Sequence, residues 1–441
     1  MAAVRRRGPA GQQRYFKRTK MFSALRLVVA TTASCVMLFS TGLQAETLRE
    51  ALVATQKNST AIKASRARLR SQMEGVEQAR APLRPQLNLV SSVNHRYPVP
   101  DALTASIELA LDLLVYDGGT QQLAIQIEQA NTSIAKQMVV QTEQAAYLET
   151  IRAYFGVLQN QQNLALELEN QEIIQTQLNA ARERFAVGEI ARSEVDLVEA
   201  RLAQIRSSVA QLRGQLSIAR ESYKLSTGQY PDQLETSQPQ PEIPASLDDA
   251  MAIANRMHPA IQNAKLAVKI ADLNIDRVRK AARSPKVTLR AAVGGNRLLT
   301  SGQSFEDTWS IQLGGQVPLY AGGLRSSHNR QAVANSDAAR HELHRIAASV
   351  LADATNAWTQ LDILDSIIAA SREQVEYSRT AFEGVQVEAN LGLRSTLDVL
   401  DAERDFREAQ TRSTNAVLDR NIARYALLAS IGQLTASQLG L

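Results

Sequence analysis

Acidic side chains follow a glycine at the same distance in two stretches of the sequence. Glu194 comes six residues after Gly188, and Asp398 comes six residues after Gly392. One offset of 204 residues relates the first stretch to the second. Both glycines interrupt a long helical pattern, and a glycine in such a place favours the end of a helix. We therefore expect two copies of a helical hairpin, each with a glycine at its tip and a carboxylate in the returning helix.

The second tip carries the side chains with the clearest potential for chemistry. Asp398 and Asp401 are three residues apart and so share one face of a helix, and Arg394 lies two residues after the glycine. Carboxylates in this spacing most often form a solvated helix face, and an arginine beside a turn is usually a surface residue. Repeated around a pore, the same carboxylates would favour the passage of cations.

Metal binding and catalysis are not indicated elsewhere in the sequence. His341 and His344 are three residues apart, but only Glu342 accompanies them, so we expect no metal site there. The sequence has five histidines, and it contains no nucleophile motif and no phosphate-binding loop. We expect no cofactor, no bound metal and no enzymatic activity.

Residues 1–45 have the pattern of a secretory signal peptide. A basic head precedes an apolar run over residues 24–39, and Ala45 ends a segment that fits a cleavage site. A transmembrane anchor is the less favoured alternative, because an anchor needs roughly 20 unbroken apolar residues. The basic head is long, so translation could start at Met1 or at Met21.

Removal of residues 1–45 changes the charge of the chain and takes away its only cysteine. The remaining chain has 41 Lys and Arg against 44 Asp and Glu, so the basic balance belongs to the signal peptide and does not indicate nucleic-acid binding. Cys35 lacks the leucine that usually precedes a lipidated cysteine, and the apolar run continues past it. We expect neither lipidation nor a disulfide framework.

Four segments alternate between apolar and more polar residues with the period of a β-strand. Two cover residues 86–93 and 106–116, and two more lie around 287–293 and 309–319. Their length of about ten residues is what a tilted strand needs to cross a bilayer. A soluble hairpin has the same pattern, so the residues alone leave both interpretations open.

The rest of the chain has the pattern of helices. We expect helices over residues 48–80 and 247–280, each followed by proline, and a helix over 120–187 that would be about 100 Å long. A heptad pattern after the first tip predicts coiled-coil packing. Its members are Val195, Val198, Leu202, Ile205, Val209, Leu212, Leu216, Ala219 and Tyr223.

The order of elements repeats within the chain. We expect one structural repeat over residues 46–235, a linker over 236–246 and a second repeat over 247–441, each with a helix, two strands and a long helical hairpin. Tyr116 matches Tyr320 at the common offset. Four strands cannot close a membrane barrel, which takes about eight or more. If the strands cross a membrane, several chains must share one barrel.

The sequence resembles the TolC family of outer-membrane efflux and secretion channels, over essentially all of the chain after residue 45. The resemblance is carried by ARAPLRPQL at residues 79–87, Tyr-x-Gly-Gly at 116–119 and 320–323, RFAVG at 184–188 and LDVLDA at 397–402. It implies a mainly α fold with a β-barrel contribution. Long coiled-coil hairpins would be duplicated in tandem, with four transmembrane β-strands per chain. A homotrimer would then form a 12-stranded barrel and an α-helical periplasmic tunnel.

The resemblance also implies roles for the residues of the tips. Arg394 resembles the arginine that holds the periplasmic end of the family's channels shut, and Glu194 resembles its acidic partner on a neighbouring tip. Asp398 and Asp401 resemble the two aspartates that constrict the entrance. A tyrosine of the family's latch falls at Ala389 here, which leaves that part of the latch in doubt.

The partners implied by the resemblance lie on both sides of the periplasm. A periplasmic adaptor (membrane fusion) protein would grip the tips at Gly188 and Gly392, and an inner-membrane transporter of the ABC or RND type would deliver the cargo. Lipid of the cell outer membrane would surround the strands, with the helices in the periplasm. No nucleic-acid partner is expected.

We therefore expect an outer-membrane exit duct of a tripartite export system. It would pass proteins by type I secretion, or small toxic compounds, including drugs from a multidrug efflux pump. A periplasmic adaptor and a structural coiled-coil protein of the envelope are alternatives. Adaptors normally carry one hairpin rather than a tandem pair, and a coiled-coil protein has no need of paired strands.

Overall fold

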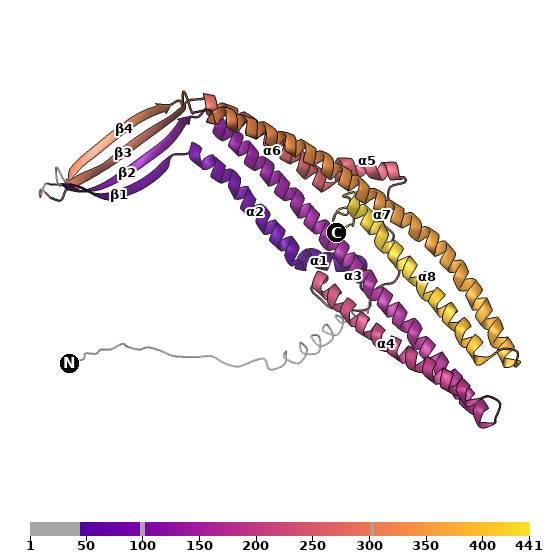
Figure 1. Ribbon diagram of the computed structural model, residues 1–441. Helices are drawn as coiled ribbons and strands as arrows, with labels where there is room; N and C mark the ends of the chain where they lie inside the picture. Colours follow the sequence, from indigo (N-terminus) through magenta and orange to yellow (C-terminus); the bar gives the residue numbers. More distant parts are fainter. Residues whose placement is uncertain (1–44, 98–101, 301–303) are drawn as a thin grey trace, which may run out of the picture. The chain divides into compact units, whose positions relative to one another are not determined.

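The computed structural model describes residues 45–97, 102–300 and 304–441 (Figure 1). The described helices and strands all lie within residues 46–441. Residues 1–44 of the expected signal peptide, with Cys35 and both candidate start residues, lie outside the described part. The signal peptide therefore stays a prediction.

The described part of the chain runs through the same order of elements in both halves. The first half contains α1 (Leu48–Asn58), α2 (Thr60–Arg80), η1 (Ala81–Leu83), β1 (Gln86–Arg96), β2 (Ala102–Tyr116), α3 (Thr120–Ala186) and α4 (Arg192–Thr227). The second contains α5 (Leu247–Met257), α6 (Pro259–Arg283), β3 (Lys286–Leu298), β4 (Glu306–Gln316), α7 (Leu324–Asn390) and α8 (Thr396–Ser430). The helices α3 and α7 each have 67 residues, which corresponds to about 100 Å.

The prediction of one continuous helix over residues 48–80 is wrong. The chain breaks at Ser59, whose Oγ accepts a hydrogen bond from the Ile62 amide at 3.4 Å and so caps α2. Next to the break, Asn58 Nδ2 donates to the Thr227 carbonyl at 2.7 Å. This hydrogen bond to a residue 169 positions away fixes the chain where the helix breaks.

The prediction of one helix over residues 247–280 is wrong for a more local reason. His258 separates α5 from α6, and its Nδ1 accepts a hydrogen bond from the Ala260 amide at 3.3 Å. Pro259 occupies the first position of α6, where its missing N–H costs nothing.

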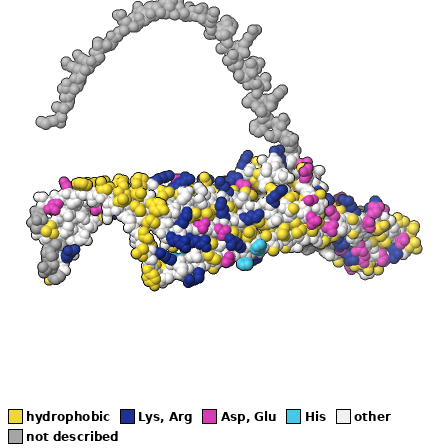
Figure 2. Space-filling model, turned by 90° about the horizontal axis from the view of Figure 1, so that it is seen from above, with side chains coloured by type: hydrophobic (Ala, Val, Ile, Leu, Met, Phe, Trp, Pro, Cys, Tyr) yellow, Lys and Arg dark blue, Asp and Glu magenta, His cyan; other side chains and the backbone are white. Residues whose placement is uncertain are grey.

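The four strands form one antiparallel sheet in the order β1-β2-β3-β4, so β2 and β3 join the two halves. The register places Leu109 of β2 opposite Leu89 and Val293. Trp309 of β4 lies opposite Val293 and is 79% exposed. Apolar side chains therefore line one face of all four strands and stay open in the single chain. Figure 2 shows hydrophobic side chains gathered over the strand end of the molecule.

The other face of the sheet carries charge. Arg290 of β3 donates to Glu108 Oε1 at 2.7 Å and lies 3.6 Å from Asp112 Oδ1, both on β2. No helix among the described residues has an apolar stretch sufficient to cross a membrane.

The helices pack as two hairpins, α3 with α4 and α7 with α8 (Figure 1). The heptad prediction after the first tip is confirmed for most of its members: Val195, Val198, Leu202, Ile205, Val209, Leu216 and Tyr223 are buried, while Leu212 and Ala219 are half-buried. An aromatic cluster supports the long helices at mid-length, where Tyr154 and Phe155 pack edge to face with ring centroids 5.6 Å apart. Tyr223 closes this cluster and donates to Glu46 Oε1 at 2.6 Å.

Candidate functional site: the hairpin tips

Both hairpin tips have the same turn. Gly188 has φ +82° and Gly392 has φ +79°, a left-handed conformation that glycine adopts without strain. In each turn the residue after the glycine donates its amide to a carbonyl in the last turn of the long helix, from Glu189 to Arg184 and from Leu393 to Glu388, both at 2.9 Å. No heavy atom would lie within 4 Å of a Cβ at either glycine, so space is open there.

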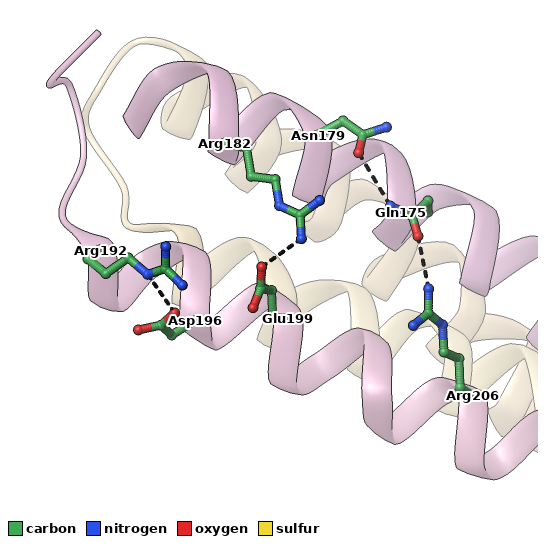
Figure 3. A network of polar contacts seen from close by, with 7 residues as sticks. All are labelled: Gln175, Asn179, Arg182, Arg192, Asp196, Glu199 and Arg206. Carbon is green, nitrogen blue, oxygen red and sulfur yellow. Dashed lines mark hydrogen bonds and ion pairs between the residues drawn. The ribbon is translucent and has the colours of Figure 1, made fainter. Parts of the chain in front are cut away.

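Charged side chains bridge the two helices of the first hairpin (Figure 3). Arg182 of α3 donates to Glu199 of α4 at 2.7 Å, and Arg206 of α4 donates to Gln175 of α3 at 3.2 Å. Arg192 pairs with Asp196 one turn further on, at 2.9 Å. The contacts of Arg182 and Arg206 join α3 to α4 at the surface of the first tip, whereas the pair of Arg192 stays within α4, and the heptad residues pack the hairpin from inside.

Asp398 caps the helix that returns from the second tip. Its Oδ2 accepts from the Ser395 amide at 3.0 Å and from Ser395 Oγ at 2.8 Å, and Ser395 Oγ accepts from the Asp398 amide at 3.2 Å. This reciprocal capping box fixes the start of α8. The hydrogen bonds from Ser395 lower the pKa of Asp398 below its usual 3.8, so the carboxylate is charged at neutral pH. One turn later, Asp401 lies 3.3 Å from Arg404.

Within one chain, Arg394 pairs with an acid of its own hairpin. Its Nε donates to Glu388 Oε2 at 2.8 Å, and this hydrogen bond raises the pKa of Arg394 further. Both side chains are about half exposed, and an exposed pair of this kind contributes little to stability. Arg394 can therefore exchange Glu388 for another carboxylate at small cost.

Glu194 makes a contact that the sequence did not suggest. Its Oε2 accepts a hydrogen bond from Thr396 Oγ1 at 2.6 Å, which ties the start of α4 to the start of α8. The structure does not bring Glu194 and Arg394 of the same chain into an ion pair. Their contact across neighbouring chains stays a prediction. Ala389 has no polar side chain, and its carbonyl accepts a hydrogen bond from the Gly392 amide at 3.0 Å.

Sequence reasoning also missed Glu403. This residue matches Glu199 in the repeat, but Glu199 is paired at the surface and Glu403 is fully buried in α8. The offset of 204 residues puts the two at the same position of their hairpins. Only the packing of the second hairpin on the first makes one of them a core residue. The histidines His341 and His344 take no part in the tips, and the described residues hold no cluster of three or more potential metal ligands.

Long paired hairpins, a sheet with an open apolar face and glycine-tipped turns define a class of envelope channel subunit, and comparisons with known proteins agree. A family model described as outer membrane efflux protein matches residues 51–229 and 251–433. The chain belongs to this family. Its members are outer-membrane exit ducts of tripartite efflux or secretion systems, in which adaptor proteins and inner-membrane transporters take part, and this chain is such a duct.

Individual relatives cover nearly the whole chain. The outer membrane efflux protein BepC of Brucella suis biovar 1 (strain 1330) is 30% identical over 429 residues, which cover 96% of this chain and 94% of the relative. The outer membrane protein TolC of Escherichia coli (strain K12) is 24% identical over 428 residues, covering 91% and 85%. The crystal structure of the outer membrane protein VceC of Vibrio cholerae has the same fold, with a TM-score of 0.73 at 18% identity over 87% of this chain and 96% of that one.

Proposed function

We propose that three copies of this chain assemble into one duct, with their strands side by side in the outer membrane and their hairpins in the periplasm. The observation that carries this proposal is the sheet. Its apolar face is open in the single chain, and β1 and β4 are free edges among the described strands. An open edge in lipid leaves backbone groups without hydrogen-bond partners, so each edge needs the edge of another chain.

The identical order of elements in the two halves supports a further part of the proposal. Residues 46–235 and 247–441 act as two structural repeats joined by the linker 236–246, and each trimer then presents six similar hairpins. The signal peptide of residues 1–45 directs the chain to the periplasm before the strands insert.

The hairpin tips form the periplasmic entrance in this proposal. Asp398 and Asp401 of three chains ring the entrance and favour cations, because like carboxylates concentrate positive charge. Arg394 leaves Glu388 for Glu194 of a neighbouring tip and holds the entrance shut. A charge-assisted hydrogen bond is directional and exchangeable, which suits a contact that a partner protein must release.

A periplasmic adaptor releases the tips by binding at their turns. Gly188 and Gly392 provide open backbone, and apolar side chains beside them are exposed, Val187 at 72% and Leu391 at 71%. An inner-membrane transporter of the ABC or RND type supplies the cargo. We propose that the cargo is a protein of type I secretion or a small toxic compound, since family membership covers both kinds of system.

Single-channel conductance in a planar bilayer tests the proposal, with wild type compared with Arg394→Ala. The loss of the arginine should enlarge a small, cation-selective conductance severalfold, because the entrance loses a closing contact. Arg192→Ala is the matched control, since Arg192 is also an exposed tip arginine with one acidic partner. An equal rise in conductance in both variants would contradict a specific role of Arg394 in closing the entrance. A folded trimer without conductance would contradict the duct.

A further inference from the structure

One face of α8 near the second tip is turned toward the first hairpin. Thr396 donates to Glu194 of α4, and Leu400, four residues on, belongs to the buried cluster that includes Val198 and Leu202. Glu403 follows Leu400 by three residues. The spacing places Thr396, Leu400 and Glu403 on one stripe of the helix. Glu403 thus occupies a buried position of this stripe, where an apolar side chain would be expected.

The carboxylate of Glu403 is buried and poorly paired. The residue is 0% exposed, and neither Oε1 nor Oε2 has a hydrogen-bond partner in the described part of the chain. Its nearest cation is Arg407 Nε at 3.9 Å, which is beyond hydrogen-bond distance. A buried carboxylate without hydrogen bonds is costly in its charged form and much less costly when protonated.

The charges around Glu403 come from three helices. Arg407 lies on α8 itself, Arg201 on α4 and Glu167 on α3, and Glu169 of α3 approaches Arg407 at 3.6 Å. Burial raises the pKa of Glu403 to about 7, against the lowering effect of Arg407 and Arg201 and with a further raising effect from Glu167. Desolvation therefore outweighs both arginines.

A groove opens beside this cluster, at the junction of the two hairpins. It has a volume of ≈ 690 Å³ and receives residues from all four long helices, including Asn170 of α3, Arg201 of α4, Leu364 and Ile367 of α7 and Arg407 of α8. The residues that α7 contributes to its lining are apolar. The groove leaves room for water beside Glu403, so a charge there would draw in water and separate the hairpins.

We propose that Glu403 is a proton-dependent contact between the two hairpins, whose protonated form holds the second hairpin packed on the first and whose ionised form loosens it. Glu403 is a positioning residue for the tips, and it acts through the α8 stripe rather than by touching cargo. The effect of Glu403 on opening of the entrance rests on the proposed function. Its effect on the packing of the two hairpins does not.

The direction of the pH effect follows from the two states. In the packed state the Glu403 pKa is about 7, and in a loosened, hydrated state it returns toward the usual 4.5. Both states hold the proton below about pH 4.5, so packing is then tightest. Between about pH 4.5 and 7 the loosened state releases its proton first, and each pH unit lowers the ratio of packed to loosened molecules by up to tenfold. Above about pH 7 the ratio is constant.

Distance measurements between spin labels test the proposal in the full chain, purified in detergent. Labels at Ala200→Cys on α4 and Gln386→Cys on α7, both exposed, report the separation of the hairpins near their tips. A Cys35→Ser background leaves no other cysteine. Wild type should shift toward longer distances between pH 5 and pH 8. Glu403→Gln should keep the short distance at both pH values, and Glu403→Leu serves the same purpose if the glutamine variant does not fold.

Glu408→Gln is the matched control, because Glu408 is an exposed glutamate of α8 that lines the same groove. It should respond to pH as wild type does. A wild type that does not respond, or a Glu403→Gln variant that responds like wild type, would overturn the inference. If distances respond as expected while no conductance is found in the bilayer, the packing contact stands and the proposed duct fails.

Discussion

At the scale of single residues, carboxylates of α8 behave differently because their surroundings differ. Asp398 stands at the helix start, where Ser395 donates two hydrogen bonds to it and stabilises its charged form. Glu403, only five residues later, is fully buried and has no hydrogen-bond partner for its carboxylate among the described residues. Burial opposes charge at Glu403, and hydrogen bonding favours charge at Asp398. Glu403 can therefore change its charge near neutral pH, and Asp398 cannot.

Asp398 should keep the proposed entrance cation-selective over the whole neutral and mildly acidic range. Its pKa lies below 3.8, so its charge is present above that value and is lost only as the pH falls through it. The difference in reversal potential between wild type and Asp398→Asn, measured in a KCl gradient, should therefore stay constant from pH 8 to about pH 5. Asp398→Asn should reduce selectivity at every pH from 8 to about 5, where wild type carries the charge, while it keeps an oxygen to cap α8.

The exposed Asp405 is the control for this prediction, since Asp405→Asn removes an equal charge from the same helix without touching the capping box. Selectivity that falls equally in both variants would show that general surface charge, and not a ring at the entrance, attracts cations.

At the scale of elements, local pattern predicted the long helices, the tips and the strands well. Between Thr120 and Tyr230 no proline interrupts the helical period, and the glycines that end helices lie where the left-handed turns are found. The breaks at Ser59 and His258 were missed. Asn58 depends on Thr227, a partner far away in sequence, whereas Pro259 gave a local signal that the apolar period concealed.

The candidate site was predictable only in part, for the same reason. Gly188, Gly392, Arg394 and Asp398 stand at turns and helix starts that local sequence marks. The burial of Glu403 depends on Leu400 packing into the core of a hairpin about 200 residues away, and no spacing within α8 reveals it. An acidic residue in a polar helix has the same pattern whether or not another helix covers it.

The turn glycines give a prediction at this scale. Gly188→Ala should destabilise the first tip by about 1–2 kcal/mol, because φ +82° forces a Cβ toward the following carbonyl oxygen. Gly214→Ala, inside α4 with open space around its Cβ position, should instead stabilise its helix by up to about 1 kcal/mol. Hydrogen exchange of the amides in the tip turn and along α4 measures both effects. Faster exchange at the tip in both variants, or in neither, would contradict the role of the left-handed turn.

At the scale of the whole molecule, the described sheet of one chain has an uncovered apolar face and unpaired edges. The helices bury their aromatic cluster within the chain. The sheet leaves the apolar side chains of its four strands uncovered, and β1 and β4 are free edges among the described strands. The opposite face carries a cluster of paired charges, with Arg290 between Glu108 and Asp112. Such a sheet has one face suited to lipid and one suited to water, and the alternation of the strands decides which residue belongs to which face.

This division predicts opposite outcomes for two neighbouring residues of β4. Ile311 lies on the apolar face, 70% exposed and opposite Ala291, and Ser310 lies on the other face, opposite Ala292. Ile311→Arg should cost about 2–4 kcal/mol per chain if this face meets the middle of a bilayer. Each chain of an oligomer would carry this free-energy cost. Little heat-resistant oligomer should therefore reach the outer-membrane fraction. Ser310→Arg, which adds the same side chain toward water, should assemble nearly as wild type. Equal assembly of the two variants would mean that the apolar face meets something other than lipid.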